Sequence, residues 1–365
     1  MDGASTLMYN LCKYMPQDSF FVITAANEFG QHSWWGCNAF DGTFSLPCQT
    51  FRMPVTKNKF ADRFKFFIFA TLKGIELLMK KEFSSVLAVF PDETDLFAGY
   101  ILSKLSGKPL VIHMHDLYSE DKKRARTFRK WLETKIFSSS SAILVTNSTF
   151  YDYYVRRGVR NVLVLNSCVD LRQKNMAASV PLKELPKTKL RIVFTGSICV
   201  TNEDAVKCFL SAIKERRDVE PVFCSFSKRD YLKNIGLGFL PKEKCINLQR
   251  SSDILFLPLS FNYSCKEEIL TAFPTKLLEY LAAARPILAV VPKGSFVEKL
   301  ITHYEVGIVV NELSEEKIAL AIEELKDEKK RAFFSKNASE TSLLFDAEKQ
   351  SKLLYSIIEK IVGGN

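Results

Sequence analysis

Short apolar runs alternate with helix-length segments along most of this chain, and this alternation constrains its fold more than any other feature. The runs are apolar or β-branched throughout, which is typical of parallel strands buried on both faces. We expect strands at residues 20–24, 86–90, 110–113, 142–146, 161–165, 190–195, 220–225, 254–257, 286–291 and 306–310. The sequence therefore predicts an α/β protein with doubly wound parallel sheets.

Segments with one apolar stripe, typical of amphipathic helices, fill many of the intervals between the strands. They lie at residues 96–105, 128–137, 205–214, 275–284, 315–325 and 347–361. A chain of 365 residues is long for one hydrophobic core, so two domains are expected.

We expect two Rossmann-like domains that face each other across a cleft. The first spans residues 1–172, a polar linker with two prolines follows at 173–188, and the second spans 189–345. The last segment, 346–365, is expected to return as a helix to the first domain. A doubly wound domain normally opens with a strand, yet only Met1 and Asp2 precede Gly3, so we expect the first strand of this domain to be missing.

Composition excludes several classes of protein. The chain is 47% hydrophobic and 25% charged, which is typical of a globular protein and not of a disordered one. We found neither a secretory signal nor a run of about 18 apolar residues that would span a bilayer, so a cytoplasmic location is expected. The nine cysteines form no C-x-x-C pair, which argues against a zinc cluster or a disulfide framework. The net charge of +10 favours anionic partners, and charge alone does not separate nucleic acid, anionic lipid and phosphorylated small molecules.

The segment at residues 273–291 carries the most specific motif. Pro274 can open a helix, whose free N–H groups form an anion site to which Lys276 adds a full charge. Glu279, about one turn later, can accept two hydrogen bonds from neighbouring hydroxyls such as those of a ribose. The alternative is a plain core helix with solvated Lys276 and Glu279.

The order of several motifs resembles family 4 glycosyltransferases of the GT-B fold. The run P-T-K-L-L-E-Y-L at residues 274–281, followed by Arg-Pro and an apolar run, is similar to the donor-binding helix of that family. Residues 2–5 resemble its first glycine-rich loop, 109–116 its strand ending in His, and 192–196 the strand and loop that open its second domain.

This resemblance implies transfer of a sugar from a nucleotide-diphosphate donor with retention of the anomeric configuration. The second domain would bind the nucleotide sugar, and the first would face the acceptor. The implied catalytic residue is His115, with His113 as the neighbour with which it could be confused. The implied donor-binding residues are Gly3, Gly196, Thr275, Lys276 and Glu279. No cofactor and no metal ion is implied, because the chain has no Asp-x-Asp cluster.

The chain departs from the family pattern in two places. Thr271 stands where many members carry the first of two carboxylates, and Glu267 and Glu268 are out of register. Ser197 and Ile198 follow Gly196 where many members carry Arg and Lys, which leaves phosphate binding to Lys276 and to candidates such as Lys228 or Arg250.

A basic and aromatic belt in the first domain is a candidate surface for an anionic membrane or for the acceptor. It comprises Lys122, Lys123, Arg124, Arg126, Arg129 and Trp131. Residues 57–67 repeat the pattern of cations and aromatics. No recognised RNA-binding motif accompanies the belt, so no nucleic-acid partner is expected. The alternative is a solvated helix face.

These observations predict a glycosyltransferase that acts on a glycan or a lipid-linked acceptor in cell-surface polysaccharide synthesis. It would be cytoplasmic and peripheral on the inner face of the plasma membrane. Two alternatives stay open. A glycosyltransferase-like binding subunit without activity would fit the missing basic pair, and a nucleotide-sugar epimerase would share the two-domain fold.

Overall fold

The computed structural model of the chain divides into two compact units. Unit 1 comprises Met1–Cys168 with Ala347–Asn365, and unit 2 comprises Val169–Asp346. The structure describes residues 3–25, 46–54, 59–80, 82–90, 93–117, 126–172, 189–226 and 229–364. The linker predicted at 173–188 lies outside the described residues.

Unit 1 is built on a parallel sheet with the strand order β3-β4-β5-β6. Its strands are β3 (Val86–Phe90), β4 (Leu110–Met114), β5 (Ala142–Val145) and β6 (Val162–Val164). Every residue of β4 and β5 is buried. This complete burial explains why their sequences are apolar without alternation.

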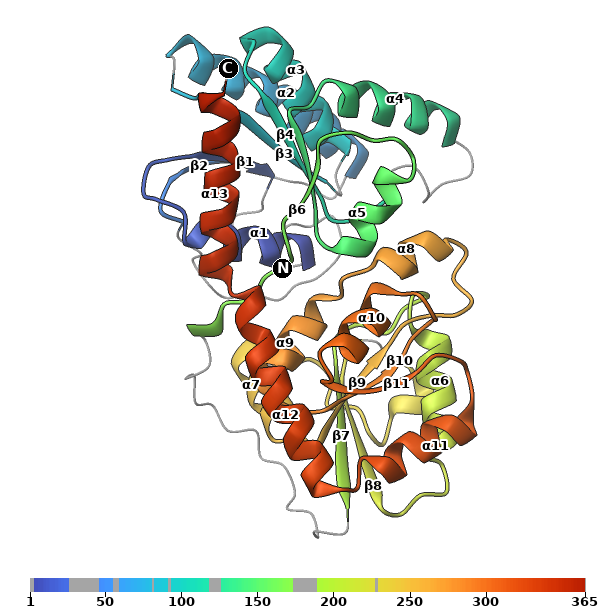
Figure 1. Ribbon diagram of the computed structural model, residues 1–365. Helices are drawn as coiled ribbons and strands as arrows, with labels where there is room; N and C mark the ends of the chain where they lie inside the picture. The colour runs from blue at the N-terminus through green and yellow to red at the C-terminus, as the bar shows by residue number, and fades with distance from the viewer. Residues whose placement is uncertain are drawn as a thin grey trace. The chain divides into compact units, whose positions relative to one another are not determined.

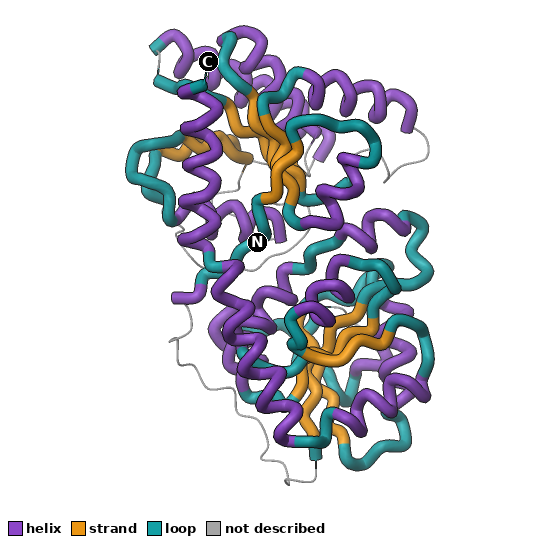
Figure 2. The backbone as a smooth tube through the Cα atoms, in the orientation of Figure 1, coloured by secondary structure: helices purple, strands orange, loops and turns teal. Residues whose placement is uncertain are grey.

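Helices cover both faces of this sheet, as Figures 1 and 2 show. They are α1 (Gly3–Lys13), α3 (Glu93–Ser106), α4 (Arg126–Ser138), α5 (Ser148–Val155) and α13 (Ala347–Gly363), whereas α2 (Lys59–Met79) packs on α3 and on the smaller sheet of unit 1. Leu11 and Leu354 from α1 and α13 pack with Val111 of β4 on one face. Ile112 of the same strand packs with Leu96 and Ile136 on the other face. Successive residues of β4 therefore enter two different cores, as the period of two in a strand requires.

A second, two-stranded parallel sheet in unit 1 pairs β1 (Phe21–Ala25) with β2 (Gln49–Met53). Among the described residues, no strand precedes α1. The helix begins at Gly3, so the interpretation of residues 2–5 as a loop before a helix is wrong for Gly3. Gly3 is the first residue of α1, and the structure describes no strand before it that would end in such a loop.

Unit 2 contains a five-stranded parallel sheet with the order β11-β10-β9-β7-β8. Its strands are β7 (Leu190–Thr195), β8 (Val219–Cys224), β9 (Ile254–Pro258), β10 (Ile287–Val290) and β11 (Gly307–Val310). The chain leaves β7 toward β8 on one side and returns to β9 on the other. Ligands of doubly wound sheets bind at the carboxyl ends of the strands beside such a reversal.

Helices also cover both faces of the unit 2 sheet. The α-helices are α6 (Glu203–Ala212), α7 (Lys242–Arg250), α8 (Lys266–Thr271), α9 (Thr275–Ala283), α10 (Phe296–His303), α11 (Glu315–Glu324) and α12 (Glu328–Ser342). Short 3-10 turns lie at Asp230–Leu232 and Leu343–Phe345. Leu255 of β9 joins the core with α9 and α10, and Phe256 joins the core with α6 and α11.

The prediction of an α/β protein with two Rossmann-like parallel-sheet domains is confirmed. All ten predicted strands are present, and β2 was not predicted. Its sequence, QTFRM, has three polar residues among five and no continuous apolar run, and Gln49 and Arg52 are exposed. No helix within the described ranges has both the length and the apolar character to cross a membrane.

Candidate functional site

The turn after β7 is the first part of the candidate donor site. Thr195 ends the strand, and its N–H donates to the buried Tyr280 hydroxyl over 3.0 Å. Gly196 follows with φ +125°, in the region that favours glycine, and its N–H donates to the Cys224 carbonyl over 2.9 Å. The chain thus turns sharply at the carboxyl edge of the sheet.

Asn202 holds the segment that leads from this turn into α6. Its Nδ2 donates to the Ser197 carbonyl over 3.1 Å, and its Oδ1 accepts from the Cys199 N–H over 3.0 Å. Asn202 is buried, so these two bonds are shielded from water. They fix the backbone where Ser197 and Ile198 replace the expected basic pair.

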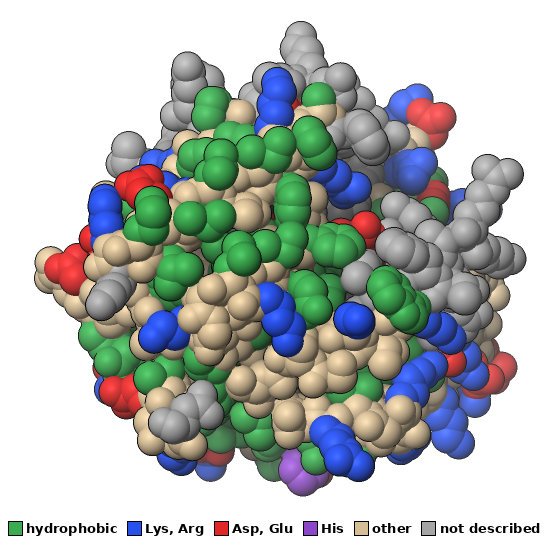
Figure 3. Space-filling model, turned by 90° about the horizontal axis from the view of Figure 1, so that it is seen from above, with side chains coloured by type: hydrophobic (Ala, Val, Ile, Leu, Met, Phe, Trp, Pro, Cys, Tyr) green, Lys and Arg blue, Asp and Glu red, His purple; other side chains and the backbone are tan. Residues whose placement is uncertain are grey.

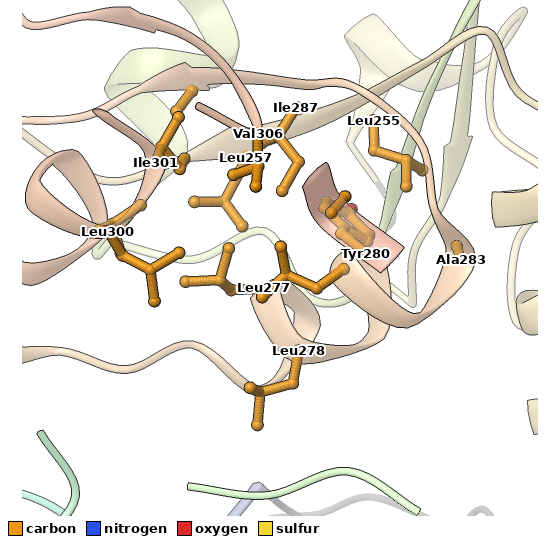
Figure 4. Packing of buried hydrophobic residues seen from close by; sticks show 14 of the residues in the cluster. Leu255, Leu257, Leu277, Leu278, Tyr280, Ala283, Ile287, Leu300, Ile301 and Val306 are labelled. Atoms are coloured by element: carbon orange, nitrogen blue, oxygen red, sulfur yellow. The ribbon is translucent and has the colours of Figure 1, made fainter. Parts of the chain in front are cut away.

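The helix α9 is the second part of the site, and its position follows from its apolar face. Leu277, Leu278, Tyr280 and Leu281 are buried in the core of unit 2. Figure 4 shows Leu277 and Tyr280 in this cluster with side chains of β9 and α10. Pro274 is the residue at the N-cap, and no side chain caps the helix there. The first N–H groups, which begin at Thr275, keep their donor capacity for a ligand.

Lys276 reaches from the first turn of α9 to the glycine turn. Its Nζ lies 4.4 Å from the centre of the Phe194 ring, and a Cβ on Gly196 would be 3.3 Å from this Nζ. Burial lowers the pKa of Lys276 to about 8, against the opposing effects of Cys199 and Glu279. No carboxylate of the described residues lies within 4.0 Å of Nζ. A desolvated cation without an ion pair is suited to bind an anion.

Glu279 lies one turn further along α9, where a glutamine fixes its carboxylate. Gln249 of α7 donates from Nε2 to Glu279 Oε2 over 3.2 Å and to Thr195 Oγ1 over 2.8 Å. Gln249 is only 1% exposed, whereas Glu279 is half-buried. The amide therefore links β7 and α9, and it orients a carboxylate that remains accessible.

Sequence analysis did not identify Gln249 as a site residue. The only available signal was a polar residue directly after Leu248 in an amphipathic segment. Its role depends on the packing of α7 between β7 and α9, which is a tertiary arrangement.

The positions that depart from the family pattern have local partners. Thr271 is buried and donates from its hydroxyl to the Glu267 carbonyl over 2.9 Å. The Arg250 carbonyl accepts from the Arg285 guanidinium, with Nε at 2.8 Å. Lys228, the other phosphate candidate, lies outside the described residues. Lys276 is a candidate cation that lies at the glycine turn.

The two candidate histidines lie at the end of β4 in unit 1. Their ring centres are 4.3 Å apart, His113 inside the strand and His115 just after it. His113 is fully buried with Nδ1 3.4 Å from Met8 Sδ, and burial, with His115 as a second cause, lowers its pKa well below the usual value. The N–H of His115 donates to the Phe90 carbonyl over 3.3 Å, and its side chain is half-buried. His115 is the more exposed residue of the two, and its Nε2 atom is itself buried.

The basic belt is described only in part. Lys122, Lys123 and Arg124 lie outside the described residues, whereas Arg126 and Arg129 belong to α4. Trp131 of the same helix is 58% exposed.

In the part of the chain that the structure describes, no group of three His, Cys, Asp or Glu side chains could hold a metal ion.

Two family models match the chain, one over residues 1–173 and one within unit 2. Residues 1–173 match the model described as glycosyltransferase family 4, and residues 218–341 match glycosyl transferases group 1. No curated protein matches by sequence.

Solved structures share the fold over nearly the whole chain. A sucrose-phosphate synthase from Thermosynechococcus elongatus has a TM-score of 0.68 at 14% identity, covering 95% of this chain and 90% of its own. Anabaena HepE in complex with UDP has a TM-score of 0.67 at 16% identity, covering 98% and 96%. An E. coli trehalose-6-phosphate synthase bound with UDP-2-fluoro glucose has a TM-score of 0.65 at 10% identity, covering 99% and 96%. At these identities the likeness shows the fold alone.

The two family models and the shared fold identify a glycosyltransferase with the GT-B fold. With one family model on each unit, the chain belongs to the family 4-like glycosyltransferases, as its motifs predicted.

Proposed function

We propose that this glycosyltransferase takes its sugar from a nucleotide-diphosphate donor bound by unit 2. The observation that carries the proposal is the arrangement of α9 against the glycine turn. An ammonium at Lys276 that no carboxylate of the described residues pairs with and an oriented carboxylate at Glu279 lie one turn apart on one helix, beside Gly196. HepE, with which the chain shares its fold, has been solved with UDP and with UDP-glucose, which supports this donor class.

The proposed chemistry follows from the charges. Lys276 and the first N–H groups of α9 neutralise the diphosphate, where negative charge develops as the sugar leaves. Glu279 accepts hydrogen bonds from the ribose hydroxyls. Transfer proceeds with retention, and a resident metal ion is not needed because the cation and the helix end provide the positive charge. His115 is the proposed catalytic residue, which donates a hydrogen bond during departure of the diphosphate.

For the acceptor, we propose a hydroxyl of a glycan or of a lipid-linked sugar in cell-surface polysaccharide synthesis. The enzyme would act at the cytoplasmic face of the plasma membrane. The exposed Trp131 and the cationic segment of α4 support contact with anionic lipid or with the acceptor.

A donor panel tests the proposed function. Purified protein is incubated with nucleotide-diphosphate sugars of each base, with and without an acceptor extract, and release of the nucleoside diphosphate is measured. We expect acceptor-dependent release for one donor, which persists in EDTA. No release from any donor would contradict the proposal, and conversion of the sugar without release would indicate an epimerase.

The Glu279→Ala variant tests the ribose contact. Removal of a charged hydrogen-bond acceptor should weaken donor binding about 10- to 150-fold. Glu298→Ala on α10 is a control, because Glu298 binds Asn311 and Gly294 outside the donor site. Unchanged donor binding by Glu279→Ala would contradict the proposed role.

A further inference from the structure

The helix α2 of unit 1 carries apolar side chains on two opposite faces. Its inner face packs into the protein, where Phe66 and Ala70 are buried with Ala98 of α3. Gly74 lies directly against Leu102 of α3, since a Cβ there would be 2.4 Å from a Leu102 methyl. This face accounts for the docking of α2 on the unit.

The outer face of α2 is apolar as well, although it faces solvent. Phe64, Ile68, Leu72 and Met79 are 63%, 41%, 62% and 74% exposed. Spacings of four, four and seven residues place them on one side of the helix, and we call them the outer stripe. A surface helix of a globular protein normally carries polar residues on this side. The outer stripe is therefore a candidate binding surface.

Cations accompany the outer stripe. Arg63 and Lys65 are exposed on either side of Phe64, and Lys80 follows Met79. Three acidic residues lie near the stripe. Glu76 is bound by Lys73 over 2.7 Å and by Lys80 over 3.1 Å, Asp62 is buried, and Glu82 lies near Lys80. The surface around the stripe is thus apolar, and its exposed cations outnumber its exposed anions.

Figure 3 looks onto the side at which α2, α3 and α4 lie in Figure 1. Hydrophobic side chains gather there, with Lys and Arg around and between them. Leu105 and Lys104 at the end of α3 are also exposed and add one residue of each kind.

We propose that the outer stripe of α2 is a docking surface for an anionic lipid bilayer. Apolar side chains on a helix that lies flat can enter the boundary between headgroups and acyl chains, while Lys and Arg bind the anionic headgroups. Charge complementarity favours lipid over a second copy of this chain, because two such surfaces would bring the same cations together. The stripe shares no residue with the donor site or with the basic belt, so lipid binding and sugar transfer can fail separately.

Vesicle sedimentation tests the proposal with the full chain. We use vesicles of phosphatidylcholine, alone or with about one third phosphatidylglycerol. The wild type should pellet with the anionic vesicles and remain mostly in solution with the neutral ones. Ile68→Glu with Leu72→Glu should lower the partition coefficient about tenfold or more, because both variants place an anion in the apolar contact.

A matched control replaces two exposed apolar residues on helices of unit 2. Leu320 is 60% exposed on α11 and Phe333 is 47% exposed on α12, so Leu320→Glu with Phe333→Glu adds the same charge. This control should bind vesicles within about twofold of the wild type. In detergent-free solution without vesicles, the stripe variant and the control variant should both turn over the donor at the wild-type rate. This result would show that both variants keep the native fold.

Replacement of the flanking cations separates charge from apolar insertion. Arg63→Ser with Lys65→Ser should weaken binding to anionic vesicles and reduce its dependence on salt. The proposal is overturned if the wild type does not bind anionic vesicles, or if the stripe variant binds as the wild type does. Light scattering tests the alternative of a second copy of the chain. If the wild type is a dimer, the stripe variant is a monomer and the wild type does not bind vesicles, the proposal is also overturned.

Discussion

Gln249 on α7 donates one hydrogen bond to Glu279 on α9 over 3.2 Å and another to Thr195 at the end of β7 over 2.8 Å. Both bonds use Nε2, and the amide is buried. A carboxylate that is held in this way has lost its rotamer freedom before any ligand arrives, which lowers the entropic cost of binding.

Gln249→Leu should therefore raise the donor KM about tenfold or more, because one hydrogen bond to a charged group contributes about 1.5 to 3 kcal/mol. The value of kcat should change little, because in the proposed site Gln249 only orients Glu279, the proposed ribose acceptor. Steady-state kinetics with a varied donor concentration measures both parameters.

Gln350 offers a control for the loss of a buried amide. It is 6% exposed on α13 in unit 1, and Gln350→Leu should affect stability without changing the donor KM. A rise in KM that is equal in both variants would mean that Gln249 acts through the general fold. A fall in kcat alone would also contradict a positioning role.

The fold could be predicted from local patterns where burial leaves a clear signature. The central strands β4, β5 and β9 are buried along their whole length, and their continuous apolar runs were recognised. Of the strands β1 and β2, only β1 was predicted, because β2 is half exposed and its sequence is typical of a loop. Likewise α12 was not predicted, since its 15 residues are largely polar and show a weak apolar stripe.

The site could be predicted where one short segment carries it. Lys276 and Glu279 belong to one helix, so their spacing already places them one turn apart. Gln249 comes from another helix and reaches Glu279 only through tertiary packing, which no local pattern encodes. The shift in the pKa of Lys276 also depends on burial in the folded unit and has no sequence signature.

The pKa of Lys276, lowered to about 8 by burial, predicts a pH dependence of donor binding. Below pH 8 the ammonium is present before the donor arrives. Above pH 8 the free enzyme must take up a proton, since a bound diphosphate raises this pKa again. The Kd of the nucleoside diphosphate should be constant from pH 6.5 to 7.5 and rise toward about tenfold per pH unit above 8.

Titration calorimetry in buffers of different ionisation enthalpy measures both the affinity and the proton uptake. Lys276→Arg is the control, because a guanidinium remains charged through this range. The Kd of this variant should be nearly independent of pH up to 9.5. If the Kd of the wild type is equally flat, Lys276 is not the group that binds the diphosphate.

The same shift predicts an effect on stability. The unfolded chain has the ordinary lysine pKa, so between pH 8 and 10.5 it binds more protons at this position than the folded chain does. Burial of the charged form therefore costs stability below pH 8, and the cost fades as the pH rises. Lys276→Met should be more stable than the wild type at pH 7, with a smaller difference at pH 9.5. Urea unfolding at both values measures this, and a difference that does not change with pH would argue against a desolvated ammonium.

His115→Ala should lower kcat about 10²- to 10⁴-fold if the imidazole donates a hydrogen bond during departure of the diphosphate. Affinity for the nucleoside diphosphate should change less, because the proposed donor contacts, Lys276 and Glu279, belong to unit 2. His303→Ala is the control, since His303 is an exposed histidine at the end of α10. Single-turnover measurements separate the chemical step from product release, and a wild-type rate in His115→Ala would remove this residue from the mechanism.

Gly196→Ala tests the close approach of Lys276 to the glycine turn. At φ +125° an alanine is strained, and its Cβ would lie 3.3 Å from both Cε and Nζ of Lys276. We expect a loss of about 1 to 3 kcal/mol in stability, together with weaker donor binding because the ammonium is displaced. Gly294→Ala separates the two effects, since Gly294 also has a positive φ, +84°, but its Cβ would meet nothing within 4 Å. That control should lose stability and keep the affinity for the nucleoside diphosphate. Equal affinities in both variants would show that the contact between Gly196 and Lys276 does not contribute to the donor site.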